Sequence, residues 1–499
     1  MYRFCIFILI SLFSVAVRSQ IPPPKYEFRG VWVATVNNID WPSKPGLPVK
    51  AQKEEAVNIL NMCTTNGMNA VILQVRPASD AFYPSNLEPW SKYLSGYPGK
   101  GPEPFYDPLQ FWIDECHKRG LEFYAWFNPF RVAQNYKEPL AGNHVAFSHP
   151  DWVLKYGDRL YFDPGLPETR NFVTKVIADV VTRYDVDGVL FDDYFYPYPL
   201  QDDFPDTASF RMYNRAWPEK YKADWRRENT DIFIRQVSQA IKKTKPWVTF
   251  GISPFGVWRN DDVDSDGSDT QAGVTSYDNL YANIIRWEKK GWIDFIIPQL
   301  YWRIGHPTVD FTTLAKWWDE HRYGRSLYIG LGIYKIDPKS ATREWASPDE
   351  IPGQIRTIRS IPGIEGSAFY SSNHFTRNLL GLQDSLQTNL YSQPAVIPPM
   401  TWIDSIPPAT PERFKKRGKK IKWTTPVNQK EMDKPTRFVI YVRPENEKTV
   451  PFRIYSICVG NRFKFTGLNH RKKKYEVRIS ALDRLNNESK ATGPVIIRM

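Results

Sequence analysis

Apolar residues along the 499-residue chain gather in eight short runs, and segments with helical periodicity lie between successive runs. Several runs are apolar on both faces, which is typical of the buried strands of parallel sheets. The eight runs are residues 28–36, 70–76, 121–127, 186–192, 248–253, 295–301, 327–334 and 365–370. Eight strands that alternate with helices predict a (β/α)8 barrel with long insertions, and an open, doubly wound sheet is the structural alternative.

Two of the connecting segments carry clear helix-stop signals. Residues 50–66 end at Gly67, and residues 109–119 end at Gly120. Glycine ends helices in this way because it adopts the left-handed conformation without a steric cost. Both segments are therefore predicted as helices that connect one barrel strand to the next.

The fourth run ends at Asp192, and a second carboxylate, Asp193, follows directly. Two acids at one strand end are costly to hold together, because like charges raise one another's pKa. Such pairs are usually kept for chemistry or for a metal, although a solvated strand end is the plain alternative. Because the catalytic groups of a (β/α)8 barrel follow the carboxyl ends of its strands, we predict that this stretch is the floor of an active site.

Polar and aromatic residues also follow most of the other strands, where a barrel is expected to bind its substrate. The aromatic share of the chain is 15%, and flat aromatic faces often line sites for ring-shaped ligands such as sugars. The predicted substrate-binding residues are Trp32, Asn37, Gln74, Arg76, Asn128, Arg131, Tyr194, Tyr196, Ser253, Arg259, Asn260, Gln299, Tyr301 and Trp302.

The loop after the fifth run contains a D-x-D-x-D-G sequence formed by Asp262, Asp264, Asp266 and Gly267. This spacing matches the first half of a calcium-binding loop, in which side-chain oxygens alternate and glycine permits a sharp turn. The bidentate glutamate expected at the twelfth position is missing, because Gly273 stands there. The loop is a candidate calcium site, with an acidic solvated loop as the alternative.

The first 19 residues have the layout of a secretory signal. Arg3 precedes an apolar run over residues 4–17, and small residues at 17 and 19 stand at positions −3 and −1 before the predicted cleavage site at Gln20. The run is too short to span a bilayer comfortably, and Cys5 lies too early to serve as a lipid-attachment cysteine. We expect an exported protein of the periplasm or the extracellular space that does not span the membrane.

The chain changes character after the last predicted barrel strand. The barrel is expected over residues 26–390, followed by a stiff Pro-rich linker at 391–411 and a small β-sandwich at 412–499. Trp423 and Tyr475 are its expected core aromatics. Residues 400–499 carry 23 Lys and Arg against 9 Asp and Glu, a net +14, whereas the remainder is −2. This basic domain is expected to favour anionic polymer surfaces.

Several sequence blocks together resemble one known family. The blocks are FRGVWVAT at 28–35, QVRP at 74–77, AWFNP at 125–129, DGVLFDDY at 187–194, GISPFG at 251–256 and PQLYW at 298–302. They resemble the glycosyl hydrolase-like 10 family over residues 26–372. Residues 421–423, 438–441 and 481–489 resemble a fibronectin type III domain. The first resemblance implies an exported (β/α)8 glycoside hydrolase, with glycan strands of the cell wall (peptidoglycan) as the substrate class.

Glycosidic hydrolysis usually needs two carboxyl groups that flank the scissile bond. Asp192 is the favoured catalytic group because it shares its strand parity with Gly188 and Leu190 and ends the strand. Asp193 is expected to orient an arginine or to bind substrate. For the second carboxylate, Asp80 is the first choice and Asp40 the next. The predicted chemistry requires no cofactor.

Two rival functions remain open at this point. A non-catalytic glycan-binding protein would use the same aromatic cleft without needing a second carboxylate. A nucleic-acid binder would act through the basic domain, but the predicted export signal and the lack of a recognition motif argue against it. The glycoside hydrolase is therefore the preferred prediction.

Overall fold

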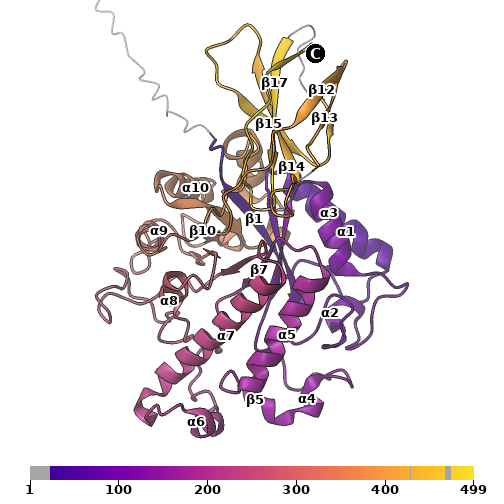
Figure 1. Cartoon of the computed structure of the whole chain (residues 1–499). Coiled ribbons are helices and arrows are strands. Elements are labelled where there is room, and N and C mark those ends of the chain that lie inside the picture. Colours follow the sequence, from indigo (N-terminus) through magenta and orange to yellow (C-terminus); the bar gives the residue numbers. More distant parts are fainter. Residues whose placement is uncertain (1–22, 428, 467–473, 499) are drawn as a thin grey trace, which may run out of the picture.

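The eight apolar runs form eight parallel strands that close into a barrel (Figure 1). The structure is a computed structural model that describes residues 23–427, 429–466 and 474–498, so the predicted signal segment lies outside the described residues. The strands, in order around the barrel, are β1 (Phe28–Val33), β2 (Ala70–Arg76), β3 (Glu122–Phe127), β7 (Gly188–Phe191), β8 (Thr249–Ile252), β9 (Phe295–Ile296), β10 (Ser326–Leu331) and β11 (Ile364–Phe369). The predicted (β/α)8 architecture is confirmed.

Helices surround the barrel. The longer ones are α1 (Val49–Thr65), α3 (Pro108–Lys118), α5 (Pro167–Arg183), α7 (Lys222–Thr244), α9 (Phe311–Glu320) and α10 (Glu350–Ser360). Shorter helices are α2 (Lys92–Ser95), α4 (Val145–Ser148), α6 (Thr207–Tyr213), α8 (Ile284–Lys289) and α11 (Leu382–Ser385). Within the described ranges, every helix is too short or too polar to cross a membrane.

Local sequence sets the ends of the first helices. The Asp107 side chain caps α3 by accepting a hydrogen bond from a backbone amide in its first turn. Gly67 and Gly120 follow α1 and α3 with φ of 72° and 73°, a region that glycine adopts readily. Both predicted helices are confirmed to within one residue at each end.

The central strand β7 depends on a glycine at its start. A Cβ atom on Gly188 would lie 2.5 Å from the Tyr124 ring and 2.6 Å from Thr249 Oγ1, so a larger residue would force the neighbouring strands apart. Leu190, two residues on, is buried in the barrel interior with Tyr124 and Trp126. Close packing here therefore fixes the strand whose end carries the paired acids.

Several strands end earlier than the apolar runs predicted. Strand β9 covers two residues because Pro298 has no amide hydrogen with which to continue the ladder. Strand β7 ends at Phe191 and β8 at Ile252, so Asp192 and Ser253 lie just beyond them. The shortening leaves the chemically interesting residues in the loops at the carboxyl ends of the strands.

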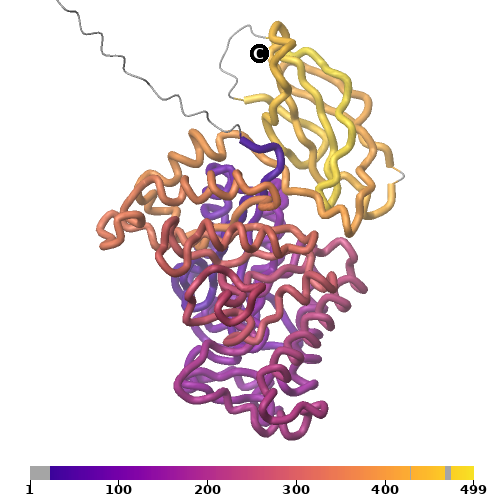
Figure 2. The backbone as a smooth tube through the Cα atoms, turned by 90° about the vertical axis from the view of Figure 1, so that its left-hand side faces the viewer, coloured from indigo at the N-terminus to yellow at the C-terminus, as the bar shows by residue number. Residues whose placement is uncertain are grey.

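The long insertion between β3 and β7 adds a small antiparallel sheet. Its strands pair in the order β4 (Arg131–Ala133), β6 (Arg159–Phe162) and β5 (Val153–Tyr156). Figures 1 and 2 place this region and α6 at one end of the molecule, opposite the C-terminal domain.

The C-terminal domain has two antiparallel sheets, as predicted for a β-sandwich. One sheet has the order β12 (Glu412–Arg417), β13 (Lys420–Thr424), β16 (Arg462–Lys464), and the other β15 (Arg453–Cys458), β14 (Arg437–Pro444), β17 (Lys474–Leu482), β18 (Val495–Arg498). Trp423 and Tyr475 are both buried, as expected for core aromatics.

This domain docks on the end of the barrel where the strands begin (Figure 2). Glu122, the first residue of β3, accepts hydrogen bonds at Oε1 from Arg437 Nη2 at 2.7 Å and from Asn486 Nδ2 at 2.9 Å. Arg484 pairs with Asp185, just before β7, at 2.7 Å. The domain is thus held at the end of the barrel opposite the carboxyl ends of the strands.

The Pro-rich segment does not hold the two domains apart, so the prediction of a spacer at 391–411 is wrong. The Val396 amide donates to the Lys25 carbonyl and the Val396 carbonyl accepts from the Glu27 amide, both at 2.9 Å. Ile397 and Met400 are buried with the inward-facing residues of the barrel. The apolar residues between the prolines therefore close the barrel floor instead of spanning a gap.

Candidate active site

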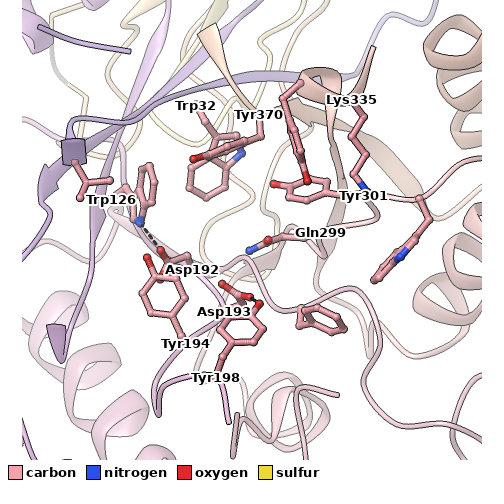
Figure 3. A pocket seen from close by; sticks show the side chains of 14 residues that line it. Trp32, Trp126, Asp192, Asp193, Tyr194, Tyr198, Gln299, Tyr301, Lys335 and Tyr370 are labelled. Carbon is pink, nitrogen blue, oxygen red and sulfur yellow. Dashed lines mark hydrogen bonds between the residues drawn. The ribbon is translucent and has the colours of Figure 1, made fainter. Parts of the chain in front are cut away.

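A cavity of about 410 Å³ opens among the loops at the carboxyl ends of the barrel strands (Figure 3). Most of its wall is aromatic, and its two acids, Asp192 and Asp193, follow β7 directly. The lining residues are Trp32, Val36, Trp126, Asp192, Asp193, Tyr194, Tyr198, Phe255, Gln299, Tyr301, Trp302, Tyr334, Lys335 and Tyr370. The arrangement is a mostly apolar cleft with a few converging polar groups, which is typical of small-molecule and sugar sites.

Asp192 is held by one of its two carboxylate oxygens. Its Oδ2 accepts hydrogen bonds from Asn128 Nδ2 at 2.6 Å and from the Trp126 indole at 3.2 Å. Its Oδ1 is buried and has no partner among the described residues. Burial and the neighbouring charge of Asp193 raise the pKa of Asp192 to about 7. The side chain is thus positioned to carry a proton that can be exchanged with a ligand.

A chain of amide groups fixes the donor that faces Asp192. Gln74 Oε1 accepts from the backbone amides of Thr35 and Val36 at 3.0 and 2.8 Å, and Gln74 Nε2 donates to Asn128 Oδ1 at 2.6 Å. These bonds orient the Asn128 amide so that its nitrogen points at Asp192. Sequence segments from β1, β2 and β3 therefore cooperate to hold one carboxylate.

Asp193 has a different set of partners. The Tyr198 hydroxyl donates a hydrogen bond to Asp193 Oδ2, and Gln299 lies across from it (Figure 3). Burial raises the pKa of this carboxyl as well. Tyr198 packs edge-on against Phe255, and Phe255 against Trp302, at centroid distances of 6.2 and 5.6 Å. Asp193 thus lies beside an apolar aromatic corner.

Comparison with known proteins places this site in a family. The family model described as glycosyl hydrolase-like 10 matches residues 27–347. The chain belongs to this family. The protein is 43% identical to glycosyl hydrolase YngK of Bacillus subtilis (strain 168) over 98% of this chain and 97% of that one. It is 37% identical to glycosyl hydrolase DigH of Escherichia coli (strain K12) over 74% of this chain and 91% of that one.

A solved structure with a similar fold is the PgaB (BpsB) glycoside hydrolase domain from Bordetella bronchiseptica. The TM-score is 0.49 and the sequence identity 12%, over 73% of this chain and 99% of that one. This likeness is too distant to bear on the reaction. The family membership and the two sequence relatives support a glycosidase in the broad sense.

In this glycosyl hydrolase-like 10 protein, part of the predicted substrate-binding set does line the cavity. Trp32, Tyr194, Gln299, Tyr301 and Trp302 face it together with the two acids. These residues come from the ends of β1, β7 and β9, which barrel closure brings to one place.

A second group of predicted residues lies behind the cavity wall. Gln74 and Asn128 act through Asp192, as described above. Arg76 is fully buried, pairs with Glu88 and donates to the Pro129 carbonyl at 3.0 Å. The Arg131 guanidinium lies 4.3 Å from the centre of the Tyr194 ring. These side chains position the site and are outside the cavity lining.

A third group has structural roles elsewhere, and for these residues substrate contact is not supported. Asn37 is exposed in the loop after β1, and Tyr196 is buried and accepts a hydrogen bond from Asn229. Ser253 Oγ donates to the Ile297 carbonyl at 2.7 Å. Asn260 Oδ1 accepts from the Ala272 amide at 2.9 Å.

The predicted partner acid Asp80 lies outside the cavity. It is buried in a separate pocket with Trp90 and Tyr93, and its Oδ1 accepts from the Ala78 amide at 2.9 Å. Burial raises its pKa to about 7. The loop after β2 turns back on itself through a bridge between Ala81 and Trp90, which carries Asp80 away from Asp192. The placement does not support Asp80 as the second catalytic carboxylate.

Asp40, the next choice, accepts hydrogen bonds from one side-chain hydroxyl and two backbone amides. Its Oδ1 accepts from Ser371 Oγ at 2.8 Å and from the Asn373 amide at 2.7 Å, and its Oδ2 from the Ala34 amide at 2.7 Å. It therefore ties the loop after β1 to the loop after β11.

The Asp-rich loop does not gather its acids in the way that the predicted calcium site would require. Asp264 pairs with Arg259 at 2.6 Å and also accepts from the Asp266 amide at 3.0 Å. Throughout the part of the chain that the structure describes, there is no group of three or more His, Cys, Asp or Glu side chains that could hold a metal ion. Arg259, which was predicted to bind substrate, neutralises the loop instead.

Seven cavity-lining residues are missing from the set predicted from the sequence, among them Trp126 in β3. The others follow strands β1, β7, β8, β10 and β11, and they are Val36, Tyr198, Phe255, Tyr334, Lys335 and Tyr370. All six loop residues follow a barrel strand, and this position in the sequence could have identified them as candidate site residues. Their number shows that the aromatic wall is larger than the sequence motifs indicated.

Proposed function

We propose that this chain hydrolyses O-glycosidic bonds of a polysaccharide and that Asp192 supplies the proton. The observation that carries the proposal is Asp192 itself, a buried acid that lines the aromatic cavity and whose Oδ1 has no hydrogen-bond partner in the described part of the protein. Because the pKa of Asp192 is raised to about 7, the carboxyl can hold a proton at neutral pH and give it to the leaving oxygen.

The proposed substrate class is the glycan strands of the cell wall. Family membership and relatives named as glycosyl hydrolases support a polysaccharide, and the aromatic walls can stack on sugar rings. The predicted export signal is compatible with a substrate in the periplasm or outside the cell. No cofactor is part of this proposal.

Digestion of purified polymers tests this function. Wild-type protein and Asp192→Asn are incubated with peptide-free cell-wall glycan strands and with plant and host polysaccharides, and products are identified by mass spectrometry. We expect wild-type to release oligosaccharides from cell-wall strands and Asp192→Asn to release almost none. Absence of products from every polymer would contradict the proposal.

The rival function, glycan binding without hydrolysis, makes a different prediction for the same samples. A binding protein would retain glycan strands equally well as wild-type and as Asp192→Asn, and it would release no product in either case. A hydrolase, in contrast, releases products only when Asp192 is present. Measuring retention and product release together therefore separates the two functions.

A second proposal concerns the basic domain, and one specific observation favours it. In the sheet formed by β12, β13 and β16, Lys415 lies opposite Lys422, which in turn lies opposite Arg462. The next row has the same character, and its members are Arg417, Lys420 and Lys464. All six are exposed, and none forms a salt bridge within the described ranges. We call these six residues the basic face.

Like charges directly opposite one another destabilise a sheet, so such a grid is unfavourable unless an anion neutralises it. We therefore propose that the basic face retains the protein on an anionic polymer of the wall. The domain docks at the strand-start end of the barrel, so this polymer is bound far from the cavity. Retention and hydrolysis are thus assigned to separate surfaces.

Charge-reversal variants test the basic face. Lys420→Glu with Lys422→Glu should abolish most salt-sensitive retention on intact cell walls in a sedimentation assay. Lys430→Glu with Lys490→Glu is the matched control, because both lysines are exposed in the same domain but lie outside the three strands. Equal loss in both double variants, or retention that is indifferent to salt, would contradict the proposal.

A further inference from the structure

The cavity holds its acids on one wall only. Within the described residues that line it, Asp192 and Asp193 are the sole carboxylates, and they are consecutive in the chain (Figure 3). The facing wall carries Trp32, Tyr301 and Tyr370 (Figure 3). Standard retaining and inverting hydrolysis instead place two carboxyls on either side of the scissile bond, about 5–5.5 or about 6.5–9.5 Å apart.

The nearby buried acids do not fill this gap. Asp40 already accepts three hydrogen bonds, from Ser371, Asn373 and Ala34, and Asp80 lies in a separate pocket. If Asp192 protonates the leaving oxygen, no protein carboxylate on the described facing wall can attack the anomeric carbon or activate a water there. A group of the substrate itself can supply the attack instead.

Asp193 and its surroundings suit one substrate group in particular. Its carboxylate is oriented by the Tyr198 hydroxyl, and it lies beside the aromatic corner of Tyr198, Phe255 and Trp302. An acetamido group combines an N–H donor, which a carboxylate accepts, with a methyl group, which an aromatic corner accommodates. Its carbonyl oxygen is then left free to point at the sugar's own anomeric carbon.

We propose that this site works by substrate participation: the 2-acetamido oxygen of the sugar attacks its own C1 while Asp193 holds the N–H. This inference rests on the proposed glycosidase function and on the role of Asp192. It restricts cleavage to 2-acetamido sugars whose C1 bond to the leaving oxygen is trans to the 2-substituent, because the oxygen attacks from the opposite face.

The steps balance without a further reactant except water. Asp192 gives its proton to the leaving oxygen as the C1–O bond breaks, and the acetamido oxygen forms a new bond to C1, giving a cyclic oxazolinium whose N–H stays on Asp193. Water then attacks C1 and passes one proton to Asp192. The bond between C1 and the acetamido oxygen breaks, the acetamido group is restored, and the product keeps the original anomeric configuration. An intramolecular attack of this kind gains from a high effective concentration.

Chemically matched glycan strands test the inference. Peptide-free strands are N-deacetylated, and one portion is re-N-acetylated while another is N-trifluoroacetylated. We expect the deacetylated strands to be cleaved at least about 100-fold more slowly than untreated strands, with full recovery after re-acetylation. The trifluoroacetylated strands are similar in shape but have a poorer nucleophile, so kcat should fall while binding is largely kept. Proton NMR should show the retained anomer first.

The outcomes separate this inference from the proposed function. Hydrolysis with an inverted anomer, or equal kcat on acetylated and trifluoroacetylated strands, would overturn participation and leave the glycosidase intact. Lack of cleavage of any strand would overturn both. As a check that does not require turnover, a bicyclic thiazoline of the 2-acetamido sugar should bind wild-type protein in calorimetry and bind Asp193→Asn at least about 10-fold more weakly. Equal binding to both proteins would count against the role of Asp193.

Discussion

The carboxylates at the two ends of strand β7 have pKa values shifted in opposite directions. Asp187 precedes the strand, and its Oδ2 accepts hydrogen bonds from the Phe123 amide at 2.7 Å and from His117 Nε2 at 2.9 Å. Burial alone would raise its pKa, but these partners lower it below the usual range. Asp192 follows the same strand, and its pKa is raised to about 7 by burial and by Asp193.

The difference teaches how to separate a structural acid from a chemical one. The two side chains lie at opposite ends of one buried strand, and burial acts to raise the pKa of both, so burial alone does not distinguish them. Asp187 has a basic partner that stabilises its charge, whereas Asp192 keeps one buried oxygen without a partner in the described protein. An uncompensated group of this kind costs stability, and it is retained where a ligand completes it.

Of the replacements considered, that of Asp192 should have the largest effect on the rate of hydrolysis. Asp192→Asn keeps an oxygen that can accept from Asn128 and Trp126, but its amide cannot donate the catalytic proton. We expect the rate of hydrolysis to fall by roughly 10³-fold. The melting temperature at pH 8 should stay the same or rise, because the substitution removes a buried charge that lies beside the charge of Asp193. A variant with near wild-type turnover would place the proton donor elsewhere.

Replacement of Asp187 should lower the stability of the protein and leave its activity nearly unchanged. Asp187→Ala leaves the Phe123 amide and His117 without their acceptor, so the free energy of unfolding should fall by about 2–4 kcal/mol. Turnover per folded molecule should remain within twofold of wild-type at a temperature well below melting. Chemical denaturation and a rate assay measure the two quantities. A large loss of activity without a loss of stability would remove the distinction between the two acids.

Truncation of Asn128 should reveal how much positioning contributes. Asn128→Ala removes a 2.6 Å hydrogen bond to Asp192 Oδ2, so we expect kcat to fall roughly 10- to 100-fold. Asn260→Ala is the matched control, since this amide was also predicted to bind substrate but lies within a loop away from the cavity. Steady-state kinetics should show Asn260→Ala unchanged. Equal losses in the two variants would favour a general effect on folding.

The pH dependence of kcat/KM tests whether a protonated Asp192 is required, although the expected change in rate is smaller. A proton donor with a pKa of about 7 is competent below that pH and loses its proton as the pH rises through it. We therefore expect kcat/KM to fall about tenfold per pH unit on the alkaline side of neutrality. Asp187, whose pKa is lowered, contributes stability that is present at neutral pH and lost only in acid. A rate that rises from pH 7 to pH 9 would contradict the assignment of Asp192.

The sequence allowed the barrel and its central acids to be predicted because both depend on local patterns. Apolar runs, helix-stop glycines and the two adjacent acids at 192–193 are visible without knowing which segments meet. The position of Asp80 was not predictable, because a loop bridge between Ala81 and Trp90 turns it away from the barrel axis.

Long-range packing explains the other differences. Tyr370 and Trp32 meet in the cavity because β11 closes onto β1, a contact between segments more than three hundred residues apart. Prolines at 391–411 suggested a spacer, but burial of Ile397 and Met400 under the barrel depends on the shape of the barrel floor. Neither contact leaves a signal in the neighbouring residues.

The most direct test is the titration of the two acids on either side of β7. Protein labelled with ¹³C at the aspartate carboxyl carbons is titrated by NMR, and the two resonances are assigned by their loss in Asp192→Asn and Asp187→Asn. The account predicts that the Asp192 resonance titrates near pH 7, as its pKa of about 7 requires, while the Asp187 resonance shows an ionised carboxylate throughout the neutral range. Titration of both resonances together in acid would contradict it.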